Sequence, residues 1–184
     1  MSIVLHIPLA LTLLRALLAP VVLLIGFTGG TPEAFAACLI AAFLSDYFDG
    51  VIARRLDSAA DSLFYLACVA VAWHLHPQAI RERWMSLGIL AALELTRYLF
   101  DLLKFRREAS YHMYSSKFWG LCLFIGFYAL LVHGHTGMLV SLAVYAGIVA
   151  DLEGLLISLV LRRWQSDVPS FVHAIRLRRG VPGR

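Results

Sequence analysis

Six long apolar stretches occupy most of this chain and limit what it can fold into. They cover residues 5–27, 34–53, 59–76, 85–104, 117–133 and 137–161. Most approach the ~20 residues that an α-helix needs to cross ~30 Å of hydrocarbon. Hydrophobic residues make up 60% of the chain and charged residues 15%, and the mean hydropathy is +0.77. A soluble helical bundle would need polar faces that these stretches mostly lack. The sequence therefore predicts an all-α integral membrane protein with six transmembrane helices.

The basic residues predict the orientation of these helices. They follow the second, fourth and sixth stretches, at Arg54 and Arg55, at Lys104, Arg106 and Arg107, and at Arg162, Arg163, Arg176, Arg178 and Arg179. The other connections are poorer in basic residues, with only Arg81 and Arg83 in the third. Because basic loops stay on the cytoplasmic side, we expect both termini to be cytoplasmic in a multi-pass protein of the cytoplasmic (inner) membrane. The net charge of +4 is then explained by orientation and anionic lipid headgroups, and no nucleic-acid partner is expected.

The rest of the chain predicts one membrane domain, residues 1–164, followed by a short basic cytoplasmic tail, residues 165–184. The first stretch lacks a basic start and carries Arg15 inside its apolar run, so it is expected to be a retained helix and not a signal peptide. The three cysteines stand singly in different stretches without metal-ligand spacing, which is typical of packing residues.

Four aspartates, Asp46, Asp49, Asp57 and Asp61, gather where the second and third stretches meet. On one ideal helix they would share a face, but a straight helix over residues 34–76 would be about twice as long as the hydrocarbon is thick. The chain must therefore reverse, and we expect the reversal close to residues 54–58. Carboxylate oxygens without paired histidine or cysteine suit hard cations, so Mg²⁺ or Mn²⁺ is the expected metal. At a cytoplasmic membrane face such cations most often meet phosphates.

Small and basic residues accompany these aspartates. Gly50 would let a substrate approach the helix backbone, Ala53 would extend that open patch, and Arg54 can offer a forked donor to a phosphate. The alternative is that charged residues at helix ends are only solvated caps, with Asp57 and the following serine starting a helix. That explanation suits any single aspartate, whereas the full set at these spacings favours a site.

The segment Asp46-x2-Asp49-Gly50-x2-Ala53-Arg54, followed by Asp57-x3-Asp61, resembles the signature of the CDP-alcohol phosphatidyltransferases, Asp-x2-Asp-Gly-x2-Ala-Arg-x8-Gly-x3-Asp-x3-Asp. The resemblance implies six transmembrane helices, a cytoplasm-facing site and a homodimer. It implies transfer of a phosphatidyl group from a CDP-linked lipid to a polar alcohol, with release of CMP.

The resemblance also implies roles for these residues. Asp46, Asp49 and Asp57 would hold the metal ions with Asp61 sharing in binding, and Asp61 would be the general base that accepts the proton of the acceptor hydroxyl. Gly50, Ala53 and Arg54 would lie against the cytidine diphosphate. The chain departs from the signature at one place, because only Arg55 and Leu56 separate Arg54 from Asp57. The family's spacer is about ten residues longer and contains a second glycine.

The first stretch resembles the family's opening helix, Pro-Asn-x-Leu-Thr-x2-Arg, through Pro8, Leu11, Thr12 and Arg15, with Leu9 in place of asparagine. This weaker resemblance places Thr12 and Arg15 near the nucleotide. An arginine inside an apolar stretch is a functional candidate because its unpaired burial is costly. Snorkelling to the nearby interface would explain Arg15 equally well.

Charged residues recur every three or four positions in the fourth stretch, at Glu94, Arg97, Asp101 and Lys104. Such a stripe should face the interior, either as a ladder of ion pairs or as part of an acceptor pocket. Asp151 and Glu153 are expected to be structural partners of Arg15 or Arg97. For an acceptor's phosphate the candidates are Lys117, Ser116, Arg107 and Arg97, although positive-inside charge explains Arg107 as well.

The sequence thus favours a metal-dependent phosphatidyltransferase of phospholipid synthesis that uses CDP-diacylglycerol. One alternative is a CDP-choline or CDP-ethanolamine phosphotransferase acting on diacylglycerol, which the same signature would serve. A second is a non-catalytic, lipid-binding relative with a shortened signature. A transporter is a third, but the carboxylates gather at one edge of the membrane and no paired broken helices are visible.

Overall fold

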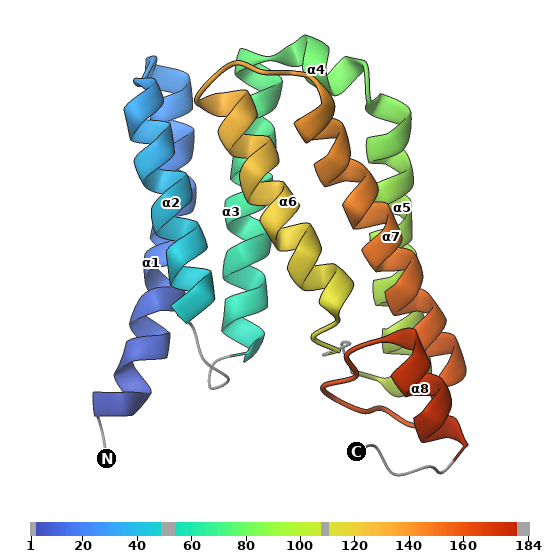
Figure 1. Ribbon diagram of the computed structural model, residues 1–184. Helices are drawn as coiled ribbons and strands as arrows, with labels where there is room; N and C mark the ends of the chain where they lie inside the picture. The colour runs from blue at the N-terminus through green and yellow to red at the C-terminus, as the bar shows by residue number, and fades with distance from the viewer. Residues whose placement is uncertain (1–2, 49–53, 108–110, 180–184) are drawn as a thin grey trace. The chain divides into compact units, whose positions relative to one another are not determined.

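The computed structural model describes residues 3–48, 54–107 and 111–179, and within them it is helical with no β-strand. The helices are α1 (Ile3–Thr28), α2 (Pro32–Phe48), α3 (Arg54–Leu75), α4 (Pro77–Arg81), α5 (Trp84–Phe105), α6 (Tyr114–Leu131), α7 (Met138–Val160) and α8 (Phe171–Arg178) (Figure 1). A long helix lies on each of the six apolar stretches. The all-α prediction is therefore confirmed.

Three of the described helices contain segments long and apolar enough to cross a membrane, namely Ala10–Thr28, Tyr114–Leu131 and Met138–Val160. α2 is shorter, with 17 residues, and α5 carries the four charged residues of its stripe. Large apolar side chains such as Leu17, Leu24 and Leu103 are exposed, which suits a surface in contact with lipid. These features indicate a membrane protein, while the six spans and their orientation stay predictions.

The chain divides into two compact units, which are described separately. Unit 1 consists of Met1–Glu82 and Gly126–Gly137, and unit 2 of Arg83–Ile125 and Met138–Arg184. α6 therefore begins in unit 2 and ends in unit 1.

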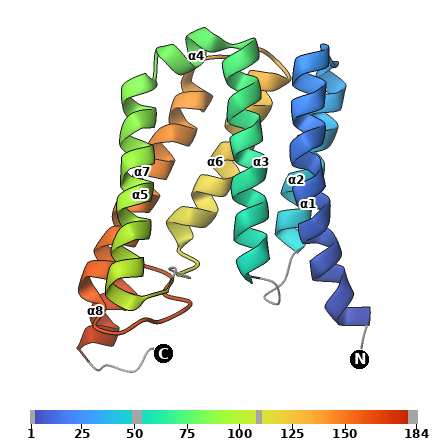
Figure 2. The ribbon, with the colours of Figure 1, turned by 180° about the vertical axis from the view of Figure 1, so that it is seen from behind.

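In unit 1, α1 packs against both α2 and α3, and Figure 2 shows α1 and α3 side by side. The buried residues of α3 recur at helical spacing, at Phe64, Ala67, Cys68 and Val71, so one face of the helix meets its neighbour. Gly26 of α1 permits the close approach, because a Cβ atom there would lie 2.6 Å from Cγ2 of Val71. Small residues commonly allow such contacts between membrane helices.

The start of α3 corrects the predicted place of the chain reversal. The second stretch was predicted to run to residue 53; α2 is described as far as Phe48, and residues 49–53 lie outside the described residues. The reversal was predicted at residues 54–58, but these residues already form the start of α3. The chain therefore does not reverse at residues 54–58.

In unit 2, α7 packs against α5 and against α8. Gly147 of α7 makes room for a large neighbour, because a Cβ atom there would lie 2.7 Å from the Trp119 ring. Toward the end of α7 an apolar cluster joins the helix to the chain that follows it, through the buried residues Tyr111, Met113, Ile157, Leu161, Val168 and Ala174. The segment after residue 165 is thus packed onto unit 2 through α8. The three cysteines are free and buried, as expected for packing residues.

Candidate active site

Among the described side chains of unit 1, Arg15 is the charged group that is most deeply buried. It lies near the middle of α1, and only 1% of its side chain is exposed. Its Nε donates to Oγ of Ser45 on α2, at 3.2 Å. The Ser45 hydroxyl in turn donates to the carbonyl oxygen of Ala42, at 2.7 Å, which fixes its orientation. Arg15 is therefore held inside the unit and does not reach its surface by snorkelling.

Two signature aspartates converge on this arginine. Nη1 of Arg15 lies 3.5 Å from Oδ1 of Asp46 on α2, and it donates to Oδ1 of Asp61 on α3. The aspartate side chains are accessible, with 53% of Asp46 and 31% of Asp61 exposed. The buried guanidinium thus holds two partly exposed carboxylates from two different helices.

This arrangement confirms that Asp46 and Asp61 lie on two different helices, as the length of the apolar segment required. It also pairs Arg15 with Asp46 and Asp61, which the sequence reasoning missed when it suggested Asp151 or Glu153 as partners. The signal available in the sequence was the cost of burying an arginine, but a cost does not name the partner. Thr12 lies one turn before Arg15 on α1 and is buried as well.

The structure describes only part of the predicted metal set. Asp49, Gly50 and Ala53 lie outside the described residues, and the side chains of Arg54 and Asp57 are not described. Asp57 stands one turn before Asp61 on α3, which places both residues on one face of that helix. Among the described residues, no group of three histidine, cysteine, aspartate or glutamate side chains could hold a metal ion. The pair Asp46 and Asp61 supplies hard oxygen donors, which fits Mg²⁺ or Mn²⁺.

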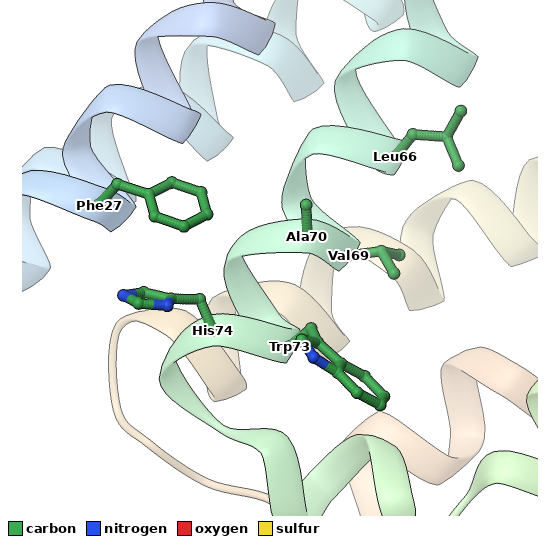
Figure 3. A pocket seen from close by; sticks show the side chains of 6 residues that line it. All are labelled: Phe27, Leu66, Val69, Ala70, Trp73 and His74. Atoms are coloured by element: carbon green, nitrogen blue, oxygen red, sulfur yellow. The ribbon is translucent and has the colours of Figure 1, made fainter.

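A hollow at the other end of α1 and α3 is apolar and does not belong to this site. It measures about 490 Å³ and is lined by Phe27, Leu66, Val69, Ala70, Trp73 and His74 (Figure 3). Phe27 and Trp73 each stand twelve residues beyond the site residue of their own helix, which is about 18 Å along the axis. The hollow offers no carboxylate, so the chemistry lies at the Arg15 end.

The charged stripe of α5 forms a network with α7 in unit 2. Nε of Arg97 lies 3.1 Å from Oδ1 of Asp151, and Nη2 of Arg97 lies 3.2 Å from Oε1 of Glu94. Gly154 makes room for this arginine, because a Cβ atom there would lie 2.8 Å from Cδ of Arg97. The prediction that Asp151 is a structural partner of Arg97 is confirmed. Arg97 is thus held by two carboxylates, which favours the ion-pair ladder over an acceptor role.

The end of α7 is fastened by several other polar side chains. Lys104 donates from Nζ to the carbonyl oxygens of Ser158, at 2.7 Å, and Leu159, at 3.1 Å, where carbonyls at a helix end lack partners within the helix. The hydroxyl groups of Tyr111 and Ser158 are hydrogen-bonded at 2.9 Å. Burial raises the pKa of Tyr111 to about 12, and the charge of nearby Asp101 adds to this effect.

Glu153 also has a structural partner, because its Oε1 accepts from the backbone N–H of Phe171, at 3.0 Å. This contact lies at the first residue of α8. Glu153 therefore anchors α8. The prediction that it pairs with Arg15 or Arg97 is wrong.

The remaining acceptor candidates lie around the start of α6. Ser116 is half-buried and Lys117 is exposed in the first turn of this helix. The exposed Arg107 stacks over the Trp164 ring, with Cζ 5.4 Å from the ring centroid. A helix N-terminus with a lysine and hydroxyl groups favours anions.

The comparison with known protein families agrees with the signature and the helical fold. The model of the family described as CDP-alcohol phosphatidyltransferase matches residues 5–152. This range includes the buried arginine and all four signature aspartates. No curated protein and no solved structure matches the chain. Because the family model covers most of the sequence, the chain belongs to the CDP-alcohol phosphatidyltransferase family.

Proposed function

We propose that this protein transfers the phosphatidyl group of CDP-diacylglycerol to a polar alcohol and releases CMP, in phospholipid biosynthesis. The observation that carries the proposal is the convergence of Asp46 and Asp61, from α2 and α3, on the buried Arg15 of α1. Membership of the family supports the type of reaction. The convergence supports the view that the two halves of the signature still meet despite the short spacer.

In this proposal the aspartates have two tasks. Asp46, Asp49 and Asp57 hold Mg²⁺ or Mn²⁺, with Asp61 sharing in binding. A bound divalent cation would neutralise the pyrophosphate charge and orient the attack at phosphorus. Asp61 accepts the proton of the acceptor hydroxyl, whose oxygen forms a bond to the phosphorus that carries diacylglycerol. The bond from that phosphorus to the oxygen of CMP breaks, and CMP leaves.

Arg15 is proposed to position these carboxylates. Its guanidinium is buried, whereas both carboxylates are partly exposed, so the arginine supports them from the inside of the unit. Thr12, Gly50, Ala53 and Arg54 are proposed to lie against the cytidine diphosphate. Of these, Thr12 is closest to the described site, one turn from Arg15 on the same face of α1.

The acceptor is proposed to be a phosphorylated alcohol, such as glycerol 3-phosphate or an inositol phosphate. Lys117, Ser116 and Arg107 are the candidate contacts for its phosphate, because two are basic and exposed and the third can donate from its hydroxyl. Arg97 would contribute only in addition to its pairs with Asp151 and Glu94. A cytoplasm-facing site in a homodimeric membrane protein completes the proposal.

The test is an assay of purified protein in neutral detergent with CDP-diacylglycerol labelled in the lipid part and a panel of alcohols, scored by lipid product. We expect one phosphorylated alcohol to give a labelled product only when Mg²⁺ or Mn²⁺ is present. If a labelled lipid product forms only when CDP-choline or CDP-ethanolamine is supplied with labelled diacylglycerol, the protein is the other type of transferase. If no combination releases CMP, the non-catalytic alternative holds.

The acceptor site is tested separately with Lys117→Gln. Loss of one charge-assisted contact to phosphate should raise KM for the phosphorylated acceptor by about tenfold, with kcat changed much less. Arg81→Gln, which removes an exposed charge from α4, is the matched control and should change neither constant. Equal effects of the two variants would contradict the role of Lys117.

A further inference from the structure

A second feature of unit 2, outside the candidate active site, is a surface pocket of about 230 Å³ between the end of α7 and α8. Its lining consists of Leu161, Arg162, Arg163, Gln165, Leu177 and Arg178. Three of these six side chains are guanidinium groups, which are charged at any physiological pH. The two leucines give the pocket a partly apolar wall.

The packing of α8 fixes this pocket in place. Phe171, Ala174 and Leu177 recur every three residues on one face of α8 and pack into the apolar cluster at the end of α7. The start of the helix is anchored through Glu153. Arg178, which follows Leu177, is therefore held next to Arg162 and Arg163 by the packing of the helix and not by a partner of its own.

The charge of the pocket is not balanced locally. Residues 160–179 contain five arginines and one acidic residue, Asp167. Asp167 pairs with His112, at 3.0 Å, and Glu153 accepts from the start of α8. The ion pairs of Arg97 with Asp151 and Glu94, and of His112 with Asp167, involve none of the pocket arginines. Three cations gathered without a carboxylate repel one another, so an anion in the pocket would stabilise the arrangement.

Size and position indicate which anion fits. The pocket is smaller than the ~300–1,000 Å³ of sites that enclose drug-sized ligands, so a phosphate group fits better than a nucleotide. Arg162 and Arg163 follow within three residues of the end of α7, whose whole length is a candidate membrane span. A cluster of arginines immediately beyond a membrane helix lies at the level of the lipid headgroups.

We propose that this pocket binds the phosphate of an anionic phospholipid. The arginines hold the phosphate oxygens through forked hydrogen bonds. Leu177, which is only partly buried, lies next to the apolar part of the lipid below its headgroup. The bound lipid would fasten α8 to the membrane surface at the end of α7. The proposal is independent of the transferase reaction, because it concerns binding at residues that take no part in that reaction.

The test measures the binding of phosphatidic acid to the full-length protein in neutral detergent, by native mass spectrometry in the presence of EDTA. Phosphatidic acid is neither a substrate nor a product of the proposed reaction, and diacylglycerol with the same acyl chains serves as the phosphate-free probe. The variant R163Q/R178Q removes two arginines from the pocket. R176Q/R179Q is the matched control, because it removes the same charge from residues at the end of α8 that do not line the pocket.

We expect R163Q/R178Q to weaken the binding of phosphatidic acid by about tenfold or more, and R176Q/R179Q to weaken it by about twofold at most. Diacylglycerol should bind equally weakly to all three proteins. Equal losses in the two variants would overturn the proposal, because a diffuse positive surface would then explain the attraction. Displacement of the lipid by equimolar glycerol 3-phosphate would also overturn it, since the ligand would then be a soluble phosphate ester. Unchanged far-UV circular dichroism shows that the variants are folded.

Discussion

Replacing Asp61 by asparagine should destabilise the protein, in addition to any effect on catalysis. The variant removes the carboxylate that accepts from Nη1 of Arg15, while the guanidinium stays 99% buried. Removing one partner of a buried ion pair destabilises a protein more than replacing both partners by apolar residues, because the remaining charge is left uncompensated. The variant therefore tests whether Arg15 depends on the signature aspartates for its burial.

The structure sets the expected size of this effect. Removal of one partner from a fully buried pair costs about 3–5 kcal/mol. Asp61 is 31% exposed, and Asp46 and Ser45 remain beside the guanidinium, so water and these groups compensate part of the loss. We expect Asp61→Asn to lower the free energy of unfolding by about 2 kcal/mol, or about 4–8 °C in melting temperature for a chain of this length.

Three other variants make the measurement specific. Asp46→Asn should cost at most about 1 kcal/mol, because Asp46 is 53% exposed and its pair is screened by solvent. Arg15→Met should lower the free energy of unfolding less than Asp61→Asn does, since it removes the buried charge itself. The double variant Arg15→Met/Asp61→Asn should recover part of the stability that Asp61→Asn loses. The assay is thermal unfolding in detergent with EDTA, followed by circular dichroism. If Arg15→Met proves more destabilising than Asp61→Asn, the argument from the buried charge is refuted.

Three further predictions concern unit 2. Gly154→Ala should destabilise the protein by about 1–2 kcal/mol despite the better helix propensity of alanine, because the new Cβ would lie 2.8 Å from Cδ of Arg97. The control Gly88→Ala, with nothing within 4 Å of its Cβ, should be neutral or stabilising. Both are measured by thermal unfolding, and equal effects of the two variants would contradict the close contact at Gly154. Tyr111→Phe should cost about 1 kcal/mol at neutral pH through the lost hydrogen bond to Ser158. The pKa of Tyr111 is about 12 in the folded state, against an ordinary value of 10.0. The stability of the wild type should therefore be constant below pH 10 and fall as the pH rises toward 12, because the unfolded chain loses this proton first. A fall of the same size in Tyr111→Phe would refute this cause. Glu153→Ala should loosen the start of α8 and speed tryptic cleavage within that helix, and an unchanged cleavage rate would show that the anchor is not needed.

The long helices could be predicted from the sequence because a membrane helix needs a continuous apolar stretch, a local property that one chain reveals. The start of α3 at Arg54 was missed, because the reversal of the chain was expected at residues 54–58. The helix α8 was missed because its apolar spacing covers only eight residues. Ser170, which caps it by accepting from the backbone N–H of His173, at 3.4 Å, was the available signal.

The candidate site could be predicted in its residues but not in its pairing. Asp46 and Asp61 were identified from their spacing and from the resemblance to the family. Their contact with Arg15 joins α1 to residues that are 31 and 46 positions away, and no local pattern encodes such a distance. Arg97 has one partner of each kind. Glu94 stands at helical spacing on the same helix, which a local pattern reveals, whereas Asp151 lies on another helix.

The most direct test of the proposed function is the rate of CMP release from CDP-diacylglycerol with the productive acceptor and Mg²⁺, compared between wild type and Asp61→Asn. Loss of a general base typically lowers the rate by a factor of about 10²–10⁴, so we expect Asp61→Asn to release CMP more slowly by a factor in this range. The control Glu33→Gln, at the opposite end of α2 from Asp46, should keep the wild-type rate. Release of CMP by Asp61→Asn at the wild-type rate would contradict the proposed site.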